Sequence, residues 1–357
     1  MKTYIKFLTK LFLKCFIKIF IFFFIVVLIT TMLEELQSFK EINVDFFFPI
    51  FLSLLNTPSI LFEMLPFIFL ISTQFYFTKL IDTNELEIFK FKGLDNLKIL
   101  KIVSIISFLL GIIFVVFFYN FSSSLKNEYV KIKNKYSNDN KYLAVINNNG
   151  LWIKDVIDEK INIINAKEIR QEFLIDVLIV QFNKNFELIQ SITSEKINIS
   201  TLQWKMINSK ISFKNETKEF KNIKFNSNFN SEKINNLFSN LSSQSIFDLV
   251  NLRKTYKSLN YSVIEIDSQI SKIISYPFYL TLITMLTVIL MYNIKYQKNT
   301  LYRIVLGIFL SVIIYYINNF FKMMGIGEKI PLLLSIWFPL IILSLINITF
   351  IMKLNEK

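Results

Sequence analysis

Six long apolar runs, separated by polar segments, dominate the pattern of this 357-residue chain. The runs cover residues 15–33, 60–77, 99–119, 273–292, 304–321 and 330–352. A helix needs about 20 consecutive apolar residues to cross the hydrocarbon core of a bilayer. The pattern therefore predicts six transmembrane helices, three before and three after a long polar segment.

The polar segment, residues 120–272, has the pattern of a β-rich domain. Short runs of β-branched and aromatic residues alternate with Asn, Ser, Lys and Asp, which favours strands joined by turns. The expected strands are 151–154, 161–164, 173–182, 186–192, 202–211 and 220–225. This spacing predicts an antiparallel sandwich or jelly roll. Residues 245–259 return to helical periodicity.

Three local features of this segment lead to finer expectations. Residues 173–180 alternate little between apolar and polar, which predicts a strand buried on both faces. Trp152 and Trp204 are expected in the core of the β domain. The sequence Asn-Asn-Asn-Gly at 147–150 predicts a turn. Residues 214–233 are rich in Asn and Lys and are expected to form a loop, except for the strand at 220–225.

The distribution of Lys and Arg indicates how the helices are oriented, because loops on the cytoplasmic side of a membrane are enriched in these residues. One side of the predicted membrane holds Lys2, Lys6, Lys10, Lys14, Lys79, Lys90, Lys92, Lys98, Lys101, Lys295, Lys298, Arg303, Lys353 and Lys357. The other side holds only Lys40, Lys322 and Lys329 in its short loops. Both termini are therefore expected in the cytoplasm and residues 120–272 outside it.

Composition supports a membrane protein and excludes several kinds of active site. Hydrophobic residues make up 53% of the chain and charged residues 19%. The chain has no His, only one Cys (Cys15) and six Gly. These absences exclude catalysis by a Ser-His or Cys-His pair and a metal held by His. They also exclude an intrachain disulfide and a glycine-rich phosphate loop. We expect no catalytic residue, metal or cofactor. The net charge of +13 is compatible with anionic lipid or with a coding bias, and no nucleic-acid partner is expected.

The loop between the second and third apolar runs, residues 83–94, predicts a short amphipathic helix. Asn84 can cap a helix whose first turn carries Glu85 and Glu87, where the positive end of the helix dipole favours carboxylates. Leu86, Phe89 and Lys90 fall on one face, and Gly93 can end the helix in the left-handed conformation. Such a helix can dock onto a partner protein, or it can lie on the lipid surface.

Several segments together resemble one protein family. Glu85-Leu86 with Gly93 seven residues after Leu86 resembles the coupling helix of the lipopolysaccharide-export permeases, the LptF/LptG family. Further matches to this family are Leu61-Phe62-Glu63-Met64-Leu65-Pro66, Gly150-Leu151-Trp152-Ile153-Lys154-Asp155, Trp204, Tyr276-Pro277, Tyr302-Arg303, Gly307 and Trp337-Phe338-Pro339. The segment at 150–155 and the exit of the first span are more similar to LptG than to LptF.

The resemblance implies a fold and a role. The fold is six transmembrane helices (3+3) with a periplasmic β-jellyroll between helices 3 and 4, divided at 1–119, 120–272 and 273–357. The role is that of a transport subunit in the bacterial inner membrane, half of a heterodimeric ABC-transporter unit that extracts lipopolysaccharide. The implied partners are an ATPase subunit dimer, which hydrolyses ATP in a separate chain, an LptF-like paralogue and an LptC-like periplasmic protein that receives the lipid.

The resemblance also implies functional residues. Glu85, with Leu86, Phe89 and Gly93, is expected to couple the chain to the ATPase, although Glu85 can also serve only as a helix-capping carboxylate. Lys40, after the first span, and Lys322, at the outer end of the fifth, are expected to contact lipid phosphates. The simpler alternative for both lysines is that their ammonium groups reach the membrane surface without binding a particular lipid.

Two other functions are compatible with part of the pattern. A mechanotransmission permease of an ABC system pushes on periplasmic partners without carrying lipid, but such chains usually have four spans. A membrane-anchored sensor with an extracytoplasmic β domain needs a cytoplasmic output domain, and the largest predicted cytoplasmic segment here has only about 20 residues.

Overall fold

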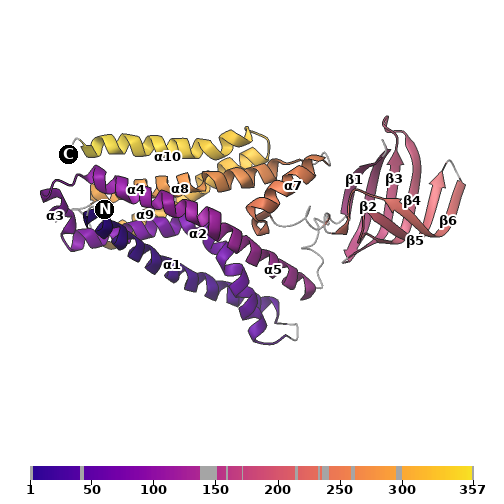
Figure 1. Cartoon of the computed structure of the whole chain (residues 1–357), viewed down its shortest axis with the longest axis horizontal. Coiled ribbons are helices and arrows are strands. Elements are labelled where there is room, and N and C mark those ends of the chain that lie inside the picture. Colours follow the sequence, from indigo (N-terminus) through magenta and orange to yellow (C-terminus); the bar gives the residue numbers. More distant parts are fainter. Residues whose placement is uncertain are drawn as a thin grey trace. The chain divides into compact units, whose positions relative to one another are not determined.

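The computed structural model describes residues 3–40, 44–136, 151–157, 160–170, 172–213, 216–231, 234, 241–258, 262–294 and 300–355. These residues form two compact units (Figure 1). The helical unit contains Met1–Tyr129, Ser242–Ile246 and Ile264–Lys357, and the β unit contains Val130–Leu241 and Phe247–Val263. The predicted turn at 147–150 lies outside the described residues.

Within the described part of the chain, six helices are long and apolar enough to cross a membrane, as predicted. They are α1 (Thr3–Ser38), α2 (Phe47–Asp82), a continuous helix made of α4 (Asn96–Ile113), the π-helical turn η1 (Phe114–Tyr119) and α5 (Asn120–Tyr136), then α8 (Ile264–Ile294), α9 (Thr300–Ile326) and α10 (Leu332–Asn355). Most extend past the predicted limits, because an apolar run marks the part of a helix in lipid and not its ends. The predicted domain limits, after residues 119 and 272, stay a prediction. The continuous helix of α4, η1 and α5 runs through the first limit, and α8 runs through the second.

The helices pack around α2 and α8. In these two, 56% and 61% of the apolar stretch is buried, against 22% in α1 and 17% in α9. Small residues allow close approach: a Cβ on Gly111 of α4 would lie 2.9 Å from the Cα of Pro277 in α8. The exposed apolar faces of α1 and α9 are the expected surface of helices that lie against lipid or another membrane chain.

A tyrosine compensates for a proline within this core. Pro66 has no N–H to offer the carbonyl of Phe62, four residues earlier in α2. The hydroxyl of Tyr276 in α8 donates a hydrogen bond to that carbonyl at 2.5 Å. The two rings stack with their centroids 4.7 Å apart. The bond therefore joins two helices and satisfies a backbone group that water cannot reach in a bilayer.

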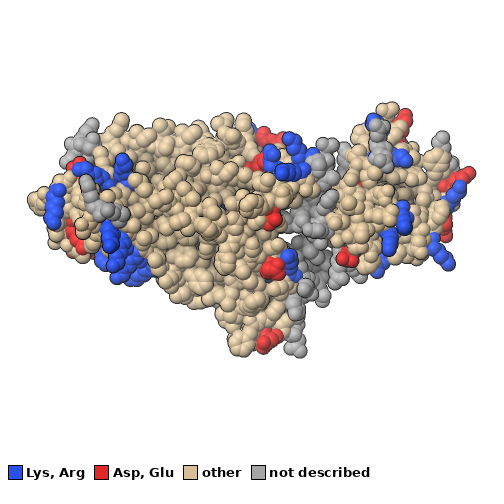
Figure 2. Space-filling view, viewed as in Figure 1, with Lys and Arg blue, Asp and Glu red and all other residues tan. Residues whose placement is uncertain are grey.

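On the face of the helical unit that Figure 2 shows, the middle part carries no described Lys, Arg, Asp or Glu side chain. Figure 2 shows Lys and Arg gathered over the end that holds α3 (Glu85–Phe91) and both termini, with uncharged side chains covering the helices beyond it. An uncharged surface of this kind is what a bilayer requires of the part of a protein that faces lipid.

The described residues of the β unit form one six-stranded antiparallel sheet. Its strands are β1 (Leu151–Ile157), β2 (Lys160–Arg170), β3 (Phe173–Phe182), β4 (Leu188–Asn198), β5 (Gln203–Phe213) and β6 (Glu216–Asn226). Each strand pairs with the next one in the chain. A jelly roll has two sheets and crossover connections, so this up-and-down order does not confirm the jelly roll. The expectation of a loop over 214–233 is wrong in part, because β6 occupies much of this segment and is longer than the strand expected at 220–225. The predicted helix at 245–259 is confirmed by α7 (Ile246–Ser258).

Two expectations about the sheet are wrong. β3 is not buried on both faces: Leu174 and Ile179 are buried, whereas Leu178 is exposed. Trp204 is fully buried, but Trp152 is 56% exposed because β1 turns it to the other face of the sheet. Asp155 of β1 faces the core and accepts hydrogen bonds from three groups: the hydroxyl of Ser227 and the backbone and side-chain nitrogens of Asn228. This contact holds the segment after β6 against β1.

Candidate functional site

The short helix α3 (Glu85–Phe91) lies between α2 and α4, at the end of the helical unit where both termini lie (Figure 1). Gly93 has a φ of +77°, and its N–H donates to the carbonyl of Lys90 while that of Leu94 donates to the carbonyl of Phe89. These two bonds form the C-terminal Schellman motif, which confirms Gly93 as the residue that ends the helix. A Cβ at Gly93 would have nothing within 4 Å, so the backbone angle alone favours glycine here.

The start of α3 differs from the prediction. Asn84 stands before the helix in the left-handed conformation (φ 55°) and makes no side-chain capping bond. Its carbonyl instead accepts from the N–H groups of Glu87 and Ile88, both at 3.2 Å. Asn tolerates the left-handed region better than most residues. Asn84 therefore permits the sharp turn out of α2 and does not cap α3 with its side chain.

The side chains of α3 divide between an inner and an outer face. Leu86 is fully buried in a cluster that includes Phe77 and Ile99, and the ring of Phe89 lies 6.0 Å from that of Phe7 in α1. On the outer face, Ile88 is 49% and Phe91 90% exposed. The predicted residues Leu86 and Phe89 thus anchor the helix to its own bundle. The sequence prediction missed Ile88 and Phe91 as the apolar side chains available on the surface.

Glu85 lies on an open groove beside α3. The groove, of about 700 Å³, is lined by Thr3, Tyr4, Phe7, Glu85, Ile88, Phe89, Lys92, Gly93, Leu94 and Lys98. The Oε2 atom of Glu85 is shielded from solvent and has no hydrogen-bond partner among the residues that the structure describes. A buried carboxylate oxygen without a partner is unfavourable. The arrangement suits a carboxylate that completes its bonding with a cationic group from outside.

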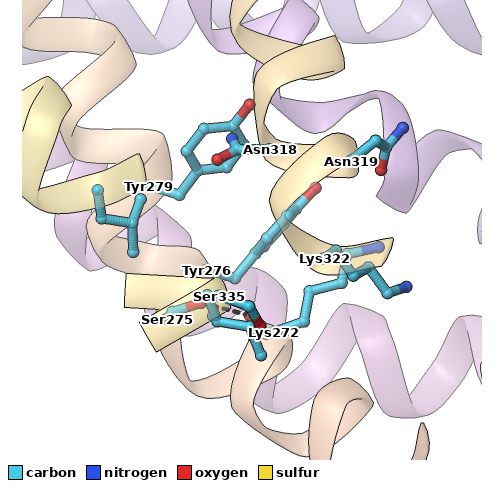
Figure 3. Close-up of a pocket in the computed structure, with 10 residues that line it drawn as sticks. Lys272, Ser275, Tyr276, Tyr279, Asn318, Asn319, Lys322 and Ser335 are labelled. Atoms are coloured by element: carbon cyan, nitrogen blue, oxygen red, sulfur yellow. Dashed lines mark hydrogen bonds between the residues drawn. The ribbon is translucent and has the colours of Figure 1, made fainter. Parts of the chain in front are cut away.

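A second polar site lies at the opposite end of the bundle, among α8, α9 and α10 (Figure 3). Its volume is about 80 Å³ and its lining comprises Lys272, Ser275, Tyr276, Tyr279, Asn318, Asn319, Lys322, Ser335, Ile336 and Leu340. Figure 3 shows the side chains of Lys272 and Lys322 extending toward the same side of the pocket. The structure thus brings the predicted Lys322 together with Lys272, which the sequence prediction did not single out.

The charges of this pocket favour an anion. Lys272 and Lys322 are both half-buried and lie within electrostatic range of each other. Glu63 and Glu265 are also in range of Lys322, but both are exposed and neither lines the pocket. Two ammonium groups with nearby hydroxyl and amide donors form a site that a phosphate oxygen can enter.

Lys40 does not take part in this pocket. It follows α1 in a turn and is exposed, and within the described part of the chain its ammonium group makes no hydrogen bond or ion pair. It remains available to a ligand at the membrane surface.

Comparison with known proteins identifies the family. The family model of the lipopolysaccharide export system permease LptF/LptG matches residues 6–353. The chain belongs to this family. A search of curated proteins found no match. As an LptF/LptG permease it is a multi-pass protein of the inner membrane and belongs to a family of transport subunits. The match covers both paralogues together, so the closer likeness to LptG stays a prediction. The described residues hold no group of His, Cys, Asp and Glu that suits a metal ion.

Proposed function

We propose that this LptF/LptG chain is one of two membrane subunits of an ABC-type lipopolysaccharide exporter. Its family match over residues 6–353 is the observation that carries the proposal. The partners are an LptF-like paralogue, an ATPase subunit dimer and an LptC-like periplasmic protein. Both termini and α3 face the cytoplasm, and the sheet of the β unit faces the periplasm, in agreement with the Lys and Arg content of the loops.

In this proposal α3 transmits force from the ATPase. The unpartnered Oε2 of Glu85 pairs with a basic side chain of the ATPase, and Ile88 and Phe91 enter an apolar depression beside it. Three further residues support this contact without touching the ATPase. Leu86 and Phe89 hold α3 against the bundle, and Gly93 sets where the helix ends. A motion of the ATPase then passes through α3 into α2 and α4.

Lipid phosphate is held at the other end of the bundle. The pocket that contains Lys272 and Lys322 takes a phosphate of the lipopolysaccharide, and Lys40 adds a third cation at the same membrane surface. Each cation near an anionic head group contributes about 1 kcal/mol, which salt screens. Binding at this level suits a subunit that draws lipid from the outer leaflet of the inner membrane.

The test begins with affinity purification of the full-length chain in mild detergent, in which an ATPase and a second six-span chain are expected to co-purify. Glu85→Gln is then compared with Glu87→Gln, a matched change in the same helix that lies outside the groove. A hydrogen bond to a charged group contributes about 1.5–3 kcal/mol. Glu85→Gln is therefore expected to lower lipopolysaccharide release from proteoliposomes at least ten-fold while ATP hydrolysis persists. Wild-type release by Glu85→Gln would remove Glu85 from the coupling step.

A further inference from the structure

A row of lysines follows the N-terminal part of α1. Lys6, Lys10, Lys14 and Lys18 repeat at every fourth position, and all four side chains are exposed. At a rise of 1.5 Å per residue the row extends over about 18 Å. Residues four apart are neighbours on a helix surface, so the ammonium groups of successive lysines repel one another. The row lies at the end of the bundle opposite the pocket of Lys322.

No carboxylate neutralises this row within the described part of the chain. Lys79, in the neighbouring helix α2, adds to this charge. Lys14, Lys18 and Lys79 all lie within electrostatic range of Cys15. Lys79 is also exposed. Three cations thus gather around one level of α1 and α2, and among the described residues none of them forms an ion pair.

The same level of α1 also carries exposed apolar side chains. Ile17, Ile21 and Ile25, whose positions flank those of Lys14 and Lys18 on the helix surface, are each at least 50% exposed. An exposed isoleucine of a membrane helix packs on acyl chains or on another membrane chain, and the lysines beside these isoleucines favour an anionic lipid here. Lys18 is the fourth residue of the apolar run at 15–33, so its ammonium group must reach back to the head-group layer.

We infer that Lys14 and Lys18, with Lys79, bind the head group of an anionic phospholipid such as phosphatidylglycerol. Its phosphate lies between the two neighbouring ammonium groups and relieves their repulsion, and its acyl chains pack on Ile21 and Ile25. This explains why lysines continue into the apolar run instead of stopping before it. The orientation of the helices in the membrane requires cations only in the segments on the cytoplasmic side, outside the apolar run. Lys6 and Lys10 lie about 6–18 Å farther from the bilayer than Lys14 and Lys18 and add only weak, non-specific attraction.

The experiment reports lipid at this position directly. In a Cys15→Ser background, Ile17→Cys carries a bimane fluorophore. The full-length chain, together with the membrane partner and the ATPase that co-purify with it, is reconstituted in phosphatidylcholine bilayers. Nitroxide-labelled phosphatidylglycerol or phosphatidylcholine is added as quencher, and the ratio of the two quenching constants measures selectivity. We expect a preference for phosphatidylglycerol that falls about five-fold for each lysine removed, the factor that corresponds to about 1 kcal/mol per lysine near an anionic surface.

Three variants make the result specific. Lys14→Gln/Lys18→Gln is expected to lower the ratio about 25-fold, the product of two five-fold losses. Lys14→Arg/Lys18→Arg is expected to keep it, because the charge is retained. Lys6→Gln/Lys10→Gln removes the same net charge and is expected to change the ratio less than two-fold. A wild-type ratio near one, or equal losses in the two Gln variants, would overturn the inference. So would a bimane that neither lipid quenches, because this face of α1 would then be covered by protein.

Discussion

Phe91 offers the sharpest test of docking through α3. It is the last residue of α3 and is 90% exposed. Its ring therefore contributes little to the fold, and Ala has a higher helix propensity than Phe by about 0.5 kcal/mol. Phe91→Ala is expected to leave the helical unit as stable as the wild type. Any loss of function then reports a contact with another molecule.

The expected size of the effect follows from burial. Moving a Phe side chain from water into an apolar depression contributes about 1.5–3 kcal/mol, and aromatic anchors are among the residues that dominate interfaces. Because about 1.4 kcal/mol corresponds to a factor of ten, Phe91→Ala is expected to raise the Kd for the ATPase subunit by about 10- to 150-fold. Ile88→Ala acts at the same surface, with a smaller effect because Ile88 is only 49% exposed.

The assay is a titration of detergent-solubilised membrane complex, freed of its ATPase, with labelled ATPase subunit. Ile105→Ala is the matched control, since Ile105 is 50% exposed on α4 and lies within the membrane span. It is expected to bind as the wild type does. Leu86→Ala is the opposite case: Leu86 is fully buried, so this change costs about 2–5 kcal/mol and is expected to speed hydrogen exchange throughout α3.

Wild-type affinity in both Phe91→Ala and Ile88→Ala would refute the docking geometry. Such a result would mean that the outer face of α3 lies on lipid, the alternative that the amphipathic sequence left open. Reduced affinity in Ile105→Ala would instead show that the assay reports general damage to the complex.

The remaining predictions concern lipid and topology. Lys322→Glu is expected to reduce crosslinking of lipopolysaccharide more than Lys329→Glu, because Lys322 lines the polar pocket and Lys329 does not; equal effects would contradict the pocket. Lys40→Glu is expected to lower lipid capture more than Lys40→Ala, most strongly at low salt, whereas unchanged capture would leave Lys40 without a lipid role. In a Cys15→Ser background, an impermeant thiol reagent on intact spheroplasts is expected to label Asn185→Cys and to spare Thr83→Cys. Labelling of Thr83→Cys would invert the proposed orientation.

The amino-acid sequence alone determined the helical part of the fold. Each apolar run is long enough to cross a bilayer, and lipid has no water to satisfy backbone groups, so a helix was the expected structure at each run. The end of α3 was also readable, because the left-handed φ of Gly93 is a property that glycine accepts and other residues resist. In both cases the deciding interaction lies between residues close together in the chain.

Tertiary structure decided which face of each element is covered. Leu86 and Phe91 are both apolar and lie five residues apart in α3, yet Leu86 is fully buried and Phe91 is exposed. The reason is tertiary: the fold places the face of α3 that carries Leu86 against Phe77 and Ile99. Trp152 is exposed because β1 turns it away from the core. Lys272 and Lys322 are 50 positions apart in the chain and share a pocket only through the packing of α8 against α9. Contacts of this kind depend on distant segments, and no local pattern of residues encodes them.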